Sequence, residues 1–331
     1  MLHENAPLST TATLSPGPVD LAGVVDRIHA EVSAVVVGQS DVVTTALAVL
    51  LARGHLLVED VPGVGKTTLA KAIARTVSAD VGRVQFTPDL LPSDLTGVSV
   101  YRAERHEFEF RPGPVFAHIV IADEINRASP KTQSALLECM AEQQVTVDGT
   151  TYPLPRPFFV VATQNPVEME GTYALPEAQR DRFMARVAVG YPDSATEVSM
   201  LDDRDSGDPL ERITPVTDAH GIEALRDRVA SLYASAAVKQ YVVDLVSGTR
   251  TRDDLRLGAS PRASLQLLAA ARAHAAISGR DHVLPDDVQK MTSHVLAHRV
   301  VLRTEARLDG RSTDDVILDV LRTTPVPAHR R

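Results

Sequence analysis

A glycine-rich run between an apolar segment and a helical pattern constrains the fold of this chain more than any other feature. The run reads DVPGVGKTT, from Asp60 to Thr68, and directly follows the apolar segment His55–Glu59. This order of strand, loop and helix is the context that the phosphate-loop pattern GxxxxGK[ST] requires. Asp60 replaces the glycine at the first position of the pattern. The intact remainder still predicts a phosphate-binding loop, with a plain glycine-rich turn as the alternative.

The residues of this loop are expected to bind phosphate in two ways. Backbone N–H groups and the helix N-terminus surround the β-phosphate, and Gly63 and Gly65 let the backbone approach without a Cβ clash. Lys66 is expected to reach the β- and γ-phosphate oxygens, and the Thr67 hydroxyl to complete a Mg²⁺ shell. The predicted nucleotide-binding set in the loop is Pro62, Gly63, Val64, Gly65, Lys66, Thr67 and Thr68.

A second motif ends an apolar strand in two adjacent carboxylates. It reads HIVIADEINRA, from His118 to Ala128. Asp123 is expected to hold Mg²⁺ through its water shell, and Glu124 to orient and deprotonate the attacking water. Alone, the pattern equally fits solvated acids at a strand end. Because it follows a phosphate loop, and both motifs serve one Mg–nucleotide, it predicts a hydrolytic site.

A third motif, FFVVATQNP, ends another apolar strand in the polar residues Thr163, Gln164 and Asn165. An amide at such a strand tip can hydrogen-bond a γ-phosphate or the lytic water. The alternative is a strand-to-turn cap, since Asn-Pro is a common turn. With the two preceding motifs present, Asn165 is expected to sense the phosphate.

Two arginines precede the next predicted strand, in the run LPEAQRDRFMARV. Nothing in the chain's own site needs Arg180 or Arg182. An arginine supplied to a neighbour's γ-phosphate stabilises transition-state charge and raises the rate by about 10³–10⁵. On spacing alone, an ion pair with Asp181 or Glu177 is the better interpretation.

A further arginine, Arg262, lies in the first turn of the predicted helix Ser260–Ser278. The helix dipole disfavours a cation there, which indicates an external anion such as a phosphate. A solvated arginine is the alternative interpretation of this motif.

Apolar segments alternate with helical patterns from Val19 to about Pro192, which predicts a parallel sheet with crossover helices. The segments are short and apolar without alternation, as expected of strands buried on both faces. The predicted strands are His55–Glu59, Val84–Phe86, His118–Asp123, Phe158–Thr163 and Ala185–Val189, and the predicted helices are Gly65–Ser78, Lys131–Glu142 and Glu177–Phe183.

Two insertions into this core have the pattern of β-hairpins. The first pairs Gly97–Arg102 with Glu107–Arg111. The second pairs Gln144–Val147 with Thr151–Leu154 around Asp148-Gly149, a strong hairpin-turn dipeptide.

After Asp193 no further strand is expected. Six helices are predicted there: Ala195–Asp203, Gly221–Ser231, Ala236–Thr249, Ser260–Ser278, Pro285–Ala297 and Ser312–Leu321. The chain is therefore expected to comprise a disordered tail over residues 1–18, an α/β core over 19–192 and a helical domain over 193–331.

Composition narrows the classes of function. The formal net charge is −9, which disfavours nucleic acid as a partner because phosphate neutralisation needs clustered Lys and Arg. The single cysteine, Cys139, excludes an intramolecular disulfide. The N-terminus lacks the pattern of a signal peptide, and the longest apolar run, Ala46–Ala52, is far shorter than a membrane span of about 20 residues. We expect a cytoplasmic protein without membrane insertion.

Taken together, the motifs resemble the MoxR family of AAA+ ATPases over essentially everything beyond the N-terminal tail. The resemblance implies a P-loop NTPase αβα domain with a parallel sheet, followed by a small all-helical lid. The strings that carry it are VGQ, LVEDVPGVGKTTLAKAIA, VQFTPDLLPSDLTG, FRPGPVFAHIVIADEINRASPKTQSALLECMAE, ATQNPVEMEGTYALPEAQRDRF, SPRA and VLAHRV.

The resemblance also implies individual roles. Asp60 resembles a variation seen in this family, so we do not take it as loss of activity. Arg180 stands where the family usually has an apolar residue, so Arg182 is the match to the finger that enters a neighbouring subunit. The other implied roles are Gly38 and Gln39 beside the adenine, Lys66 and Thr67 as the Walker A pair, Asp123 and Glu124 as the Walker B pair, Asn165 as sensor 1 and Arg262 as sensor 2.

By resemblance, the expected function is Mg²⁺-dependent ATP hydrolysis that drives chaperone-like maturation or activation of partner protein complexes. The implied assembly is a homo-oligomeric ring, a hexamer, that acts with a von Willebrand factor A domain protein. The first hairpin resembles the helix-2 insert, which projects into the ring pore or toward clients. The second resembles the pre-sensor-1 insert, with a plain solvent hairpin as the alternative.

Two other functions fit the same motifs. One is an ATP-binding assembly scaffold with very slow turnover, which the intact Lys66, Asp123 and Glu124 argue against. The other is a DNA-associated AAA+ motor, which the acidic charge disfavours.

Overall fold

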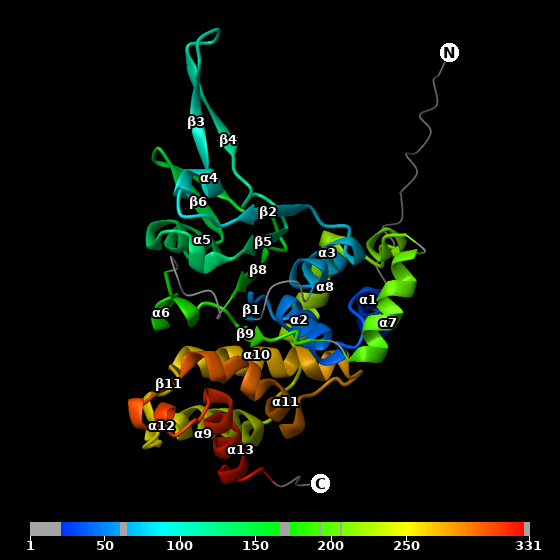
Figure 1. Cartoon of the computed structure of the whole chain (residues 1–331), viewed down its shortest axis with the longest axis vertical. Coiled ribbons are helices and arrows are strands. Elements are labelled where there is room, and N and C mark those ends of the chain that lie inside the picture. The colour runs from blue at the N-terminus through cyan, green and yellow to red at the C-terminus, as the bar shows by residue number, and fades with distance from the viewer. Residues whose placement is uncertain (1–20, 60–64, 166–172, 192, 206, 328–331) are drawn as a thin grey trace, which may run out of the picture.

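The core of the molecule is a five-stranded parallel sheet (Figure 1). The structure is a computed structural model that describes residues 21–59, 65–165, 173–191, 193–205 and 207–327. In spatial order the strands are β2 (Val81–Gln85), β5 (Ile119–Asp123), β8 (Phe159–Gln164), β1 (Leu56–Glu59) and β9 (Ala185–Val187). The predicted parallel α/β sheet is therefore confirmed.

One predicted strand is misplaced. The sequence pattern indicated Val84–Phe86, whereas β2 spans Val81–Gln85. Because β2 is the outer strand of the sheet, Val84 is its only buried residue. An edge strand with polar residues on one face lacks the continuous apolar run that identified the inner strands.

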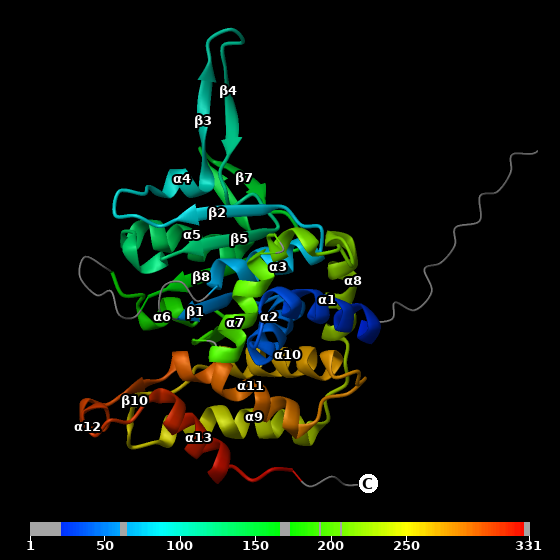
Figure 2. The ribbon, with the colours of Figure 1, turned by 45° about the vertical axis from the view of Figure 1, so that its right-hand side comes forward.

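Helices cover both faces of the sheet (Figure 2). Alternate residues of each inner strand point to opposite faces: Ile119 and Ile121 pack with α1, α2 and α3, whereas Val120 and Ala122 pack with α5. The helices of the first layer are α1 (Leu21–Val35), α2 (Ser40–Leu51) and α3 (Lys66–Thr76), and the second layer contains α5 (Pro130–Glu142) with the short α4 (Pro92–Thr96) and η1 (Ile125–Arg127). Helices α1 and α2 were not among the predicted elements, whereas the αβα arrangement is confirmed.

Both hairpins are confirmed. β3 (Gly97–Arg102) pairs with β4 (Glu107–Pro112) and projects from the body of the molecule (Figure 2). β6 (Gln144–Val147) pairs with β7 (Thr150–Pro153). Asp148 and Gly149 both have positive φ, as a two-residue hairpin turn requires.

Helices follow the sheet domain along the chain. The expectation that strands end at Asp193 is wrong in one detail, because β10 (Leu255–Leu257) and β11 (Val301–Leu302) form an antiparallel pair. Strands of two or three residues are too short to show a period in sequence. The helices are α7 (Ser194–Asp205), η2 (Pro209–Arg212), α8 (Ala219–Ala230), α9 (Ala236–Gly248), η3 (Thr249–Thr251), α10 (Pro261–Ile277), α11 (Pro285–Leu296), η4 (Ala297–Arg299), α12 (Thr304–Leu308) and α13 (Thr313–Thr323). α9 to α13 pack below the sheet in Figure 1, whereas α7 and α8 lie at the level of α1 and α3.

The α/β part and the lid share one hydrophobic cluster. Leu47 of α2, Leu267 of α10 and Val295 of α11 all belong to it. The chain after residue 193 also contacts the first helix layer, where Val216 N–H donates to Thr76 O at 2.8 Å. The boundary at residues 192/193 therefore stays a prediction, and the predicted tail over residues 1–18 lies outside the described residues.

Arginines at the junction join the two parts. Arg186 of β9 binds Glu59 of β1 and Asp314 of α13 at 3.0 and 2.6 Å. Arg53, which follows α2, binds Glu223 and Asp227 of α8, each at 2.7 Å. The lid is thus fixed by ion pairs as well as by apolar packing.

No helix in the described part of the chain has both the length and the apolar character needed to cross a bilayer.

Candidate functional site

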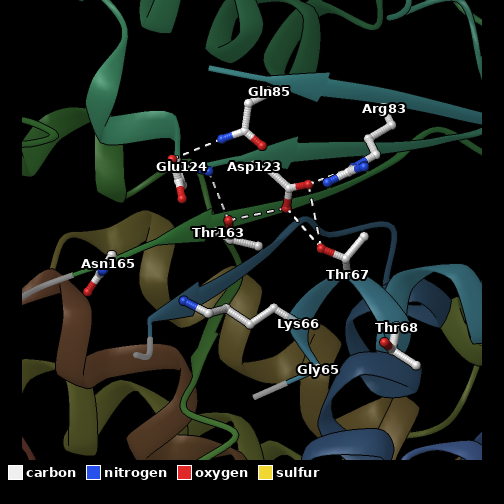
Figure 3. Close-up of a pocket in the computed structure, with 10 residues that line it drawn as sticks. All are labelled: Gly65, Lys66, Thr67, Thr68, Arg83, Gln85, Asp123, Glu124, Thr163 and Asn165. Carbon is white, nitrogen blue, oxygen red and sulfur yellow. Dashed lines mark hydrogen bonds and ion pairs between the residues drawn. The ribbon is translucent and has the colours of Figure 1, made fainter. Parts of the chain in front are cut away.

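A cleft of about 340 Å³ lies at the carboxyl ends of β2, β5 and β8, where α3 begins (Figure 3). In open α/β sheets this edge is where ligands bind, because loops and helix N-termini converge there. The described residues that line the cleft are Gly65, Lys66, Thr67, Thr68, Arg83, Gln85, Asp123, Glu124, Thr163 and Asn165.

The start of α3 brings the second half of the glycine-rich run into the cleft. Gly65 is the N-cap of α3 with φ +86, a left-handed conformation that favours glycine. Lys66 Nζ donates to Gln164 O at 3.4 Å, so its ammonium lies at the edge of the sheet beside β8. Asp60, Pro62, Gly63 and Val64 lie outside the described residues, so the first half of the predicted loop is untested.

Asp123 is a buried carboxylate at the floor of the cleft, with 5% of the residue exposed. Thr67 Oγ1 donates to its Oδ1 at 3.2 Å, and Thr163 Oγ1 to the same oxygen at 3.4 Å. Arg83 Nε donates to Oδ2 at 2.9 Å. The predicted metal pair, Thr67 and Asp123, is therefore side by side.

This donor set fits Mg²⁺. Carboxylate and hydroxyl oxygens are the ligands that Mg²⁺ prefers, and it usually completes its shell with waters and substrate phosphates. Among the described residues there is no group of three or more His, Cys, Asp or Glu that could hold a metal ion. Thr67 and Asp123 would therefore hold the ion together with nucleotide oxygens.

Glu124 enters the same cleft because of its backbone. Successive residues of a strand point to opposite faces, but Glu124 has φ 56 and ψ 50 and ends β5 in a left-handed turn. Its N–H donates to Thr163 Oγ1 at 2.9 Å. A non-glycine residue in this conformation is uncommon and is often found at functional sites. The turn allows both acids to line one cavity.

Two side chains hold the Glu124 carboxylate. Gln85 Nε2 and Arg127 Nη1 both donate to its Oε2, at 2.9 and 2.8 Å. Gln85 belongs to β2, and Arg127 to the short helix that follows Glu124. The carboxylate is thus oriented from both sides.

Asn165 lies just after β8 at the far side of the cleft from Asp123 (Figure 3). It is 5% exposed, and its backbone oxygen accepts a hydrogen bond from Asn126 Nδ2 at 3.5 Å. Its position in the cleft lining agrees with the predicted amide at the strand tip.

Arg182 is not among the described residues that line the cleft. Its Nη1 donates to Leu137 O at 2.5 Å. The alternative ion pairs expected from the sequence are not found among the described residues, because Asp181 binds Arg299 and Glu177 binds Arg256.

Arg262 is exposed in the first turn of α10 and also lies outside the described lining of the cleft. Burial lowers the pKa of Arg299 to about 10; the charge of Asp181 opposes this shift and the charge of Arg262 adds to it. Ser260, the N-cap of α10, donates to Asp181 at 3.3 Å, so the first turn of α10 lies at the junction between lid and core.

Gly38 and Gln39, expected beside the adenine, lie between α1 and α2. Gly38 has φ +76, and a Cβ added to it would lie 3.3 Å from Thr196 Oγ1 of α7. Gln39 is the N-cap of α2. Neither residue contributes to the described cleft lining.

Arg83 and Gln85 are cleft residues that the sequence interpretation missed. They flank the buried Val84 on β2, so their side chains lie on the same face of the strand. The available signal was two polar residues at a spacing of two beside an apolar one.

Two family models match the chain. The model described as the ATPase family associated with various cellular activities (AAA) matches residues 55–185, and the AAA lid domain model matches residues 247–320. The first range runs from His55 to the first residue of β9 and includes all described residues that line the cleft, and the second contains β10, α10, α11 and β11.

Three relatives match nearly the whole length of this chain. The chaperone MoxR1 of Mycobacterium tuberculosis is 43% identical over 91% of this chain and 82% of its own length. The protein MoxR of Paracoccus denitrificans is 35% identical over 91% of this chain and 95% of its own length. The uncharacterized protein YeaC of Bacillus subtilis is 47% identical over 94% of this chain and 97% of its own length.

A solved structure has the same fold. The crystal structure of a candidate ATPase from Cytophaga hutchinsonii superimposes with a TM-score of 0.86 at 38% identity, and the match covers 93% of this chain and 96% of that one.

Proposed function

The chain belongs to the MoxR family of AAA+ ATPases, and on that premise we propose that its cleft hydrolyses Mg²⁺-bound ATP. The observation that carries the proposal is that the start of α3 at Lys66 and the acid pair, Asp123 and Glu124, line one cavity (Figure 3). These groups come from separate segments of the sequence and have complementary chemistry for phosphoryl transfer.

Lys66, Thr67 and Asp123 are proposed to bind the nucleotide and its metal. The Lys66 ammonium lies 3.4 Å from Gln164 O, and a phosphate oxygen that replaces this carbonyl as acceptor gains a charge-assisted hydrogen bond. The metal, when bound, neutralises phosphate charge and orients the phosphate oxygens. Gly38 and Gln39 keep their proposed place beside the adenine.

Glu124 is proposed as the general base. Gln85 and Arg127 hold its Oε2, and we assign Oε1 to the attacking water. A carboxylate in this role takes a proton from water as the water attacks the γ-phosphorus and the bond from that phosphorus to the departing ADP oxygen breaks. Asn165 is proposed to orient the same water or the γ-phosphate from the other side of the cleft.

Arg182 and Arg262 are proposed to act on phosphate from outside the described lining. Arg182 is assigned to the cleft of a neighbouring copy, which requires a homo-oligomeric ring, and we propose a hexamer. Arg262, on the lid, is assigned to the chain's own nucleotide.

The work driven by hydrolysis is proposed to be chaperone-like remodelling of a client protein complex, with a von Willebrand factor A domain protein as partner. The support is a relative that bears the name chaperone and the projecting β3–β4 hairpin, whose Phe108 is 73% exposed. The proposed client contact is this hairpin.

Steady-state phosphate release by wild type, Glu124→Gln and Lys66→Ala tests the proposal. We expect Glu124→Gln to bind a fluorescent ATP analogue while phosphate release falls by about 10²–10⁴, and Lys66→Ala to lose nucleotide binding. Equal rates for wild type and Glu124→Gln would remove the assignment of the base and favour a slow-turnover scaffold.

A further inference from the structure

Arg83 occupies a position in the cleft that the proposed catalytic roles leave without a task. It belongs to the edge strand β2, and its Nε–H donates to Oδ2 of Asp123 at 2.9 Å. Figure 3 shows its side chain directed at the carboxylate from the side opposite Glu124. The ion pair therefore involves the acid proposed to hold Mg²⁺.

The three donors to Asp123 differ in charge. Thr67 and Thr163 donate through neutral hydroxyls, so Arg83 is the one among these three that offsets the carboxylate's charge. Asp123 is buried, and burial of an uncompensated charge is costly. Arg83 thus supplies a positive charge at the place where a bound metal would otherwise supply it.

The partners of this ion pair also differ in freedom to move. The side chain of Arg83 is 54% exposed, whereas that of Asp123 is 8% exposed. Two cations next to one carboxylate repel each other. Arg83 can turn into solvent when the metal arrives, because an edge strand leaves its long side chain uncovered, while Asp123 stays in place.

We infer that Arg83 is a positioning residue that neutralises Asp123 in the metal-free cleft and is displaced by Mg²⁺. The inference rests on the proposed nucleotide and metal site. If so, Arg83 strengthens nucleotide binding when the metal is absent and weakens it when the metal is present. Without metal it shields the phosphates from Asp123, whereas with metal it competes for the same carboxylate.

The two opposite effects define a measurable ratio. For each variant of the full-length protein, the Kd of a fluorescent ADP analogue is measured in excess Mg²⁺ and in EDTA. Arg83→Gln is expected to weaken binding in EDTA and to leave binding in Mg²⁺ equal or tighter. The Kd in EDTA divided by the Kd in Mg²⁺ should therefore be about three- to fivefold larger for Arg83→Gln than for wild type, the size expected for a half-exposed ion pair.

Two variants serve as controls. Arg83→Lys retains the positive charge and should keep the ratio within about twofold of wild type, because ion pairing rather than side-chain shape is responsible. Arg75→Gln removes the same charge from an exposed position in the last turn of α3, so its ratio should equal that of wild type.

An unchanged ratio in Arg83→Gln overturns the inference, and so does a ratio in Arg83→Lys that matches Arg83→Gln. Equal weakening in both buffers also overturns it, since that result indicates only a structural defect. If wild type binds the analogue in neither buffer, the proposed nucleotide site itself is wrong. Thermal unfolding of each variant checks that it is folded.

Discussion

Arginine–carboxylate pairs occur in two regions of this molecule, the cleft and the junction between core and lid, and Arg299 at the junction is far more buried than the arginines of the cleft. In the cleft, Arg83 and Arg127 have side chains 54% and 47% exposed. At the junction, the side chain of Arg299 is 1% exposed where it binds Asp181 at 2.8 Å. An exposed arginine–carboxylate pair in the cleft can thus be replaced by a ligand, whereas the buried pair of Arg299 holds the lid to the core.

Burial explains the difference. An exposed pair contributes little because water and salt compensate each charge, so a ligand can replace one partner at small cost. A buried pair cannot lose a partner without leaving an uncompensated charge in a medium of low dielectric. Arg299 also donates to Phe183 O at 2.6 Å and to Gln266, which fixes η4 against the segment that follows α6 (Glu177–Arg180).

The largest effect on catalysis is expected for Arg182, which is assigned to the cleft of a neighbouring copy. Arg182→Ala should lower ATP hydrolysis by about 10³ or more, because the arginine proposed to stabilise transition-state charge in the neighbouring cleft is lost. Nucleotide binding should persist. Mixing with Lys66→Ala subunits should restore part of the activity, since the two defects lie on opposite sides of one interface. The absence of rescue at every mixing ratio would contradict a shared site.

The largest effect on stability is expected for Arg299, the buried arginine of the junction. Arg299→Ala should lower the free energy of unfolding by about 3–5 kcal/mol, because it removes the buried guanidinium that is the ion-pair partner of Asp181. Urea unfolding followed by circular dichroism measures the change. A loss below about 1 kcal/mol would show that the junction pair behaves like an exposed one.

Asp287 is a buried carboxylate inside the lid, and the pH dependence of stability reports on its ion pair. Burial alone would raise its pKa, but hydrogen bonds from His274 and Arg280 outweigh it and hold the pKa of this carboxyl below its ordinary value. A lowered folded-state pKa stabilises the protein above the unfolded pKa of about 4, and that stability is lost as pH falls through the folded-state value.

We therefore expect Asp287→Asn to lower the free energy of unfolding at pH 7 by about 1.5–3 kcal/mol, the range for hydrogen bonds to a charged group. The difference from wild type should shrink below about pH 4. Unfolding measured from pH 7 to pH 3 tests this, and a difference independent of pH would argue against a charged Asp287.

Arg256 gives the smallest effect and sets the lower end of the comparison. Its side chain is 66% exposed and binds Glu177 at 2.9 Å, between β10 and the start of α6. Arg256→Ala should change the free energy of unfolding by less than about 1 kcal/mol. It is therefore the matched control for Arg299→Ala at the same junction, and a larger loss would show that exposure does not separate weak ion pairs from strong ones.

Much of the fold could be predicted because its signals are local. The inner strands carry short apolar runs, Asp148-Gly149 specifies a hairpin turn, and Ser235 and Ser312 cap helices through their own side chains. β2 and β10 could not be found in the same way. β2 lies at the sheet edge and has a single buried residue, Val84, and β10 has three residues.

The sequence predicted the two acidic residues of the cleft, but it did not predict the side chains that bind those acids. Asp123 and Glu124 follow a recognisable strand, whereas Gln85 and Arg127 hold Glu124 only because β2 pairs with β5 and a left-handed turn follows it. In the sequence, Arg83 is one of many polar residues. Its pairing with Asp123 depends on a register that matches Gln85 with Asp123.

The sequence by itself determined the phosphate-loop helix start, the acid pair, the parallel α/β core and the family, because these depend on residue order over short stretches. Only the tertiary structure decided which arginine meets which carboxylate and how much water reaches each pair. Those partners lie far apart along the chain, as Arg299 and Asp181 do, and burial is a property of packing that no local pattern encodes. The distinction between exchangeable and fixed ion pairs therefore exists only in the folded molecule.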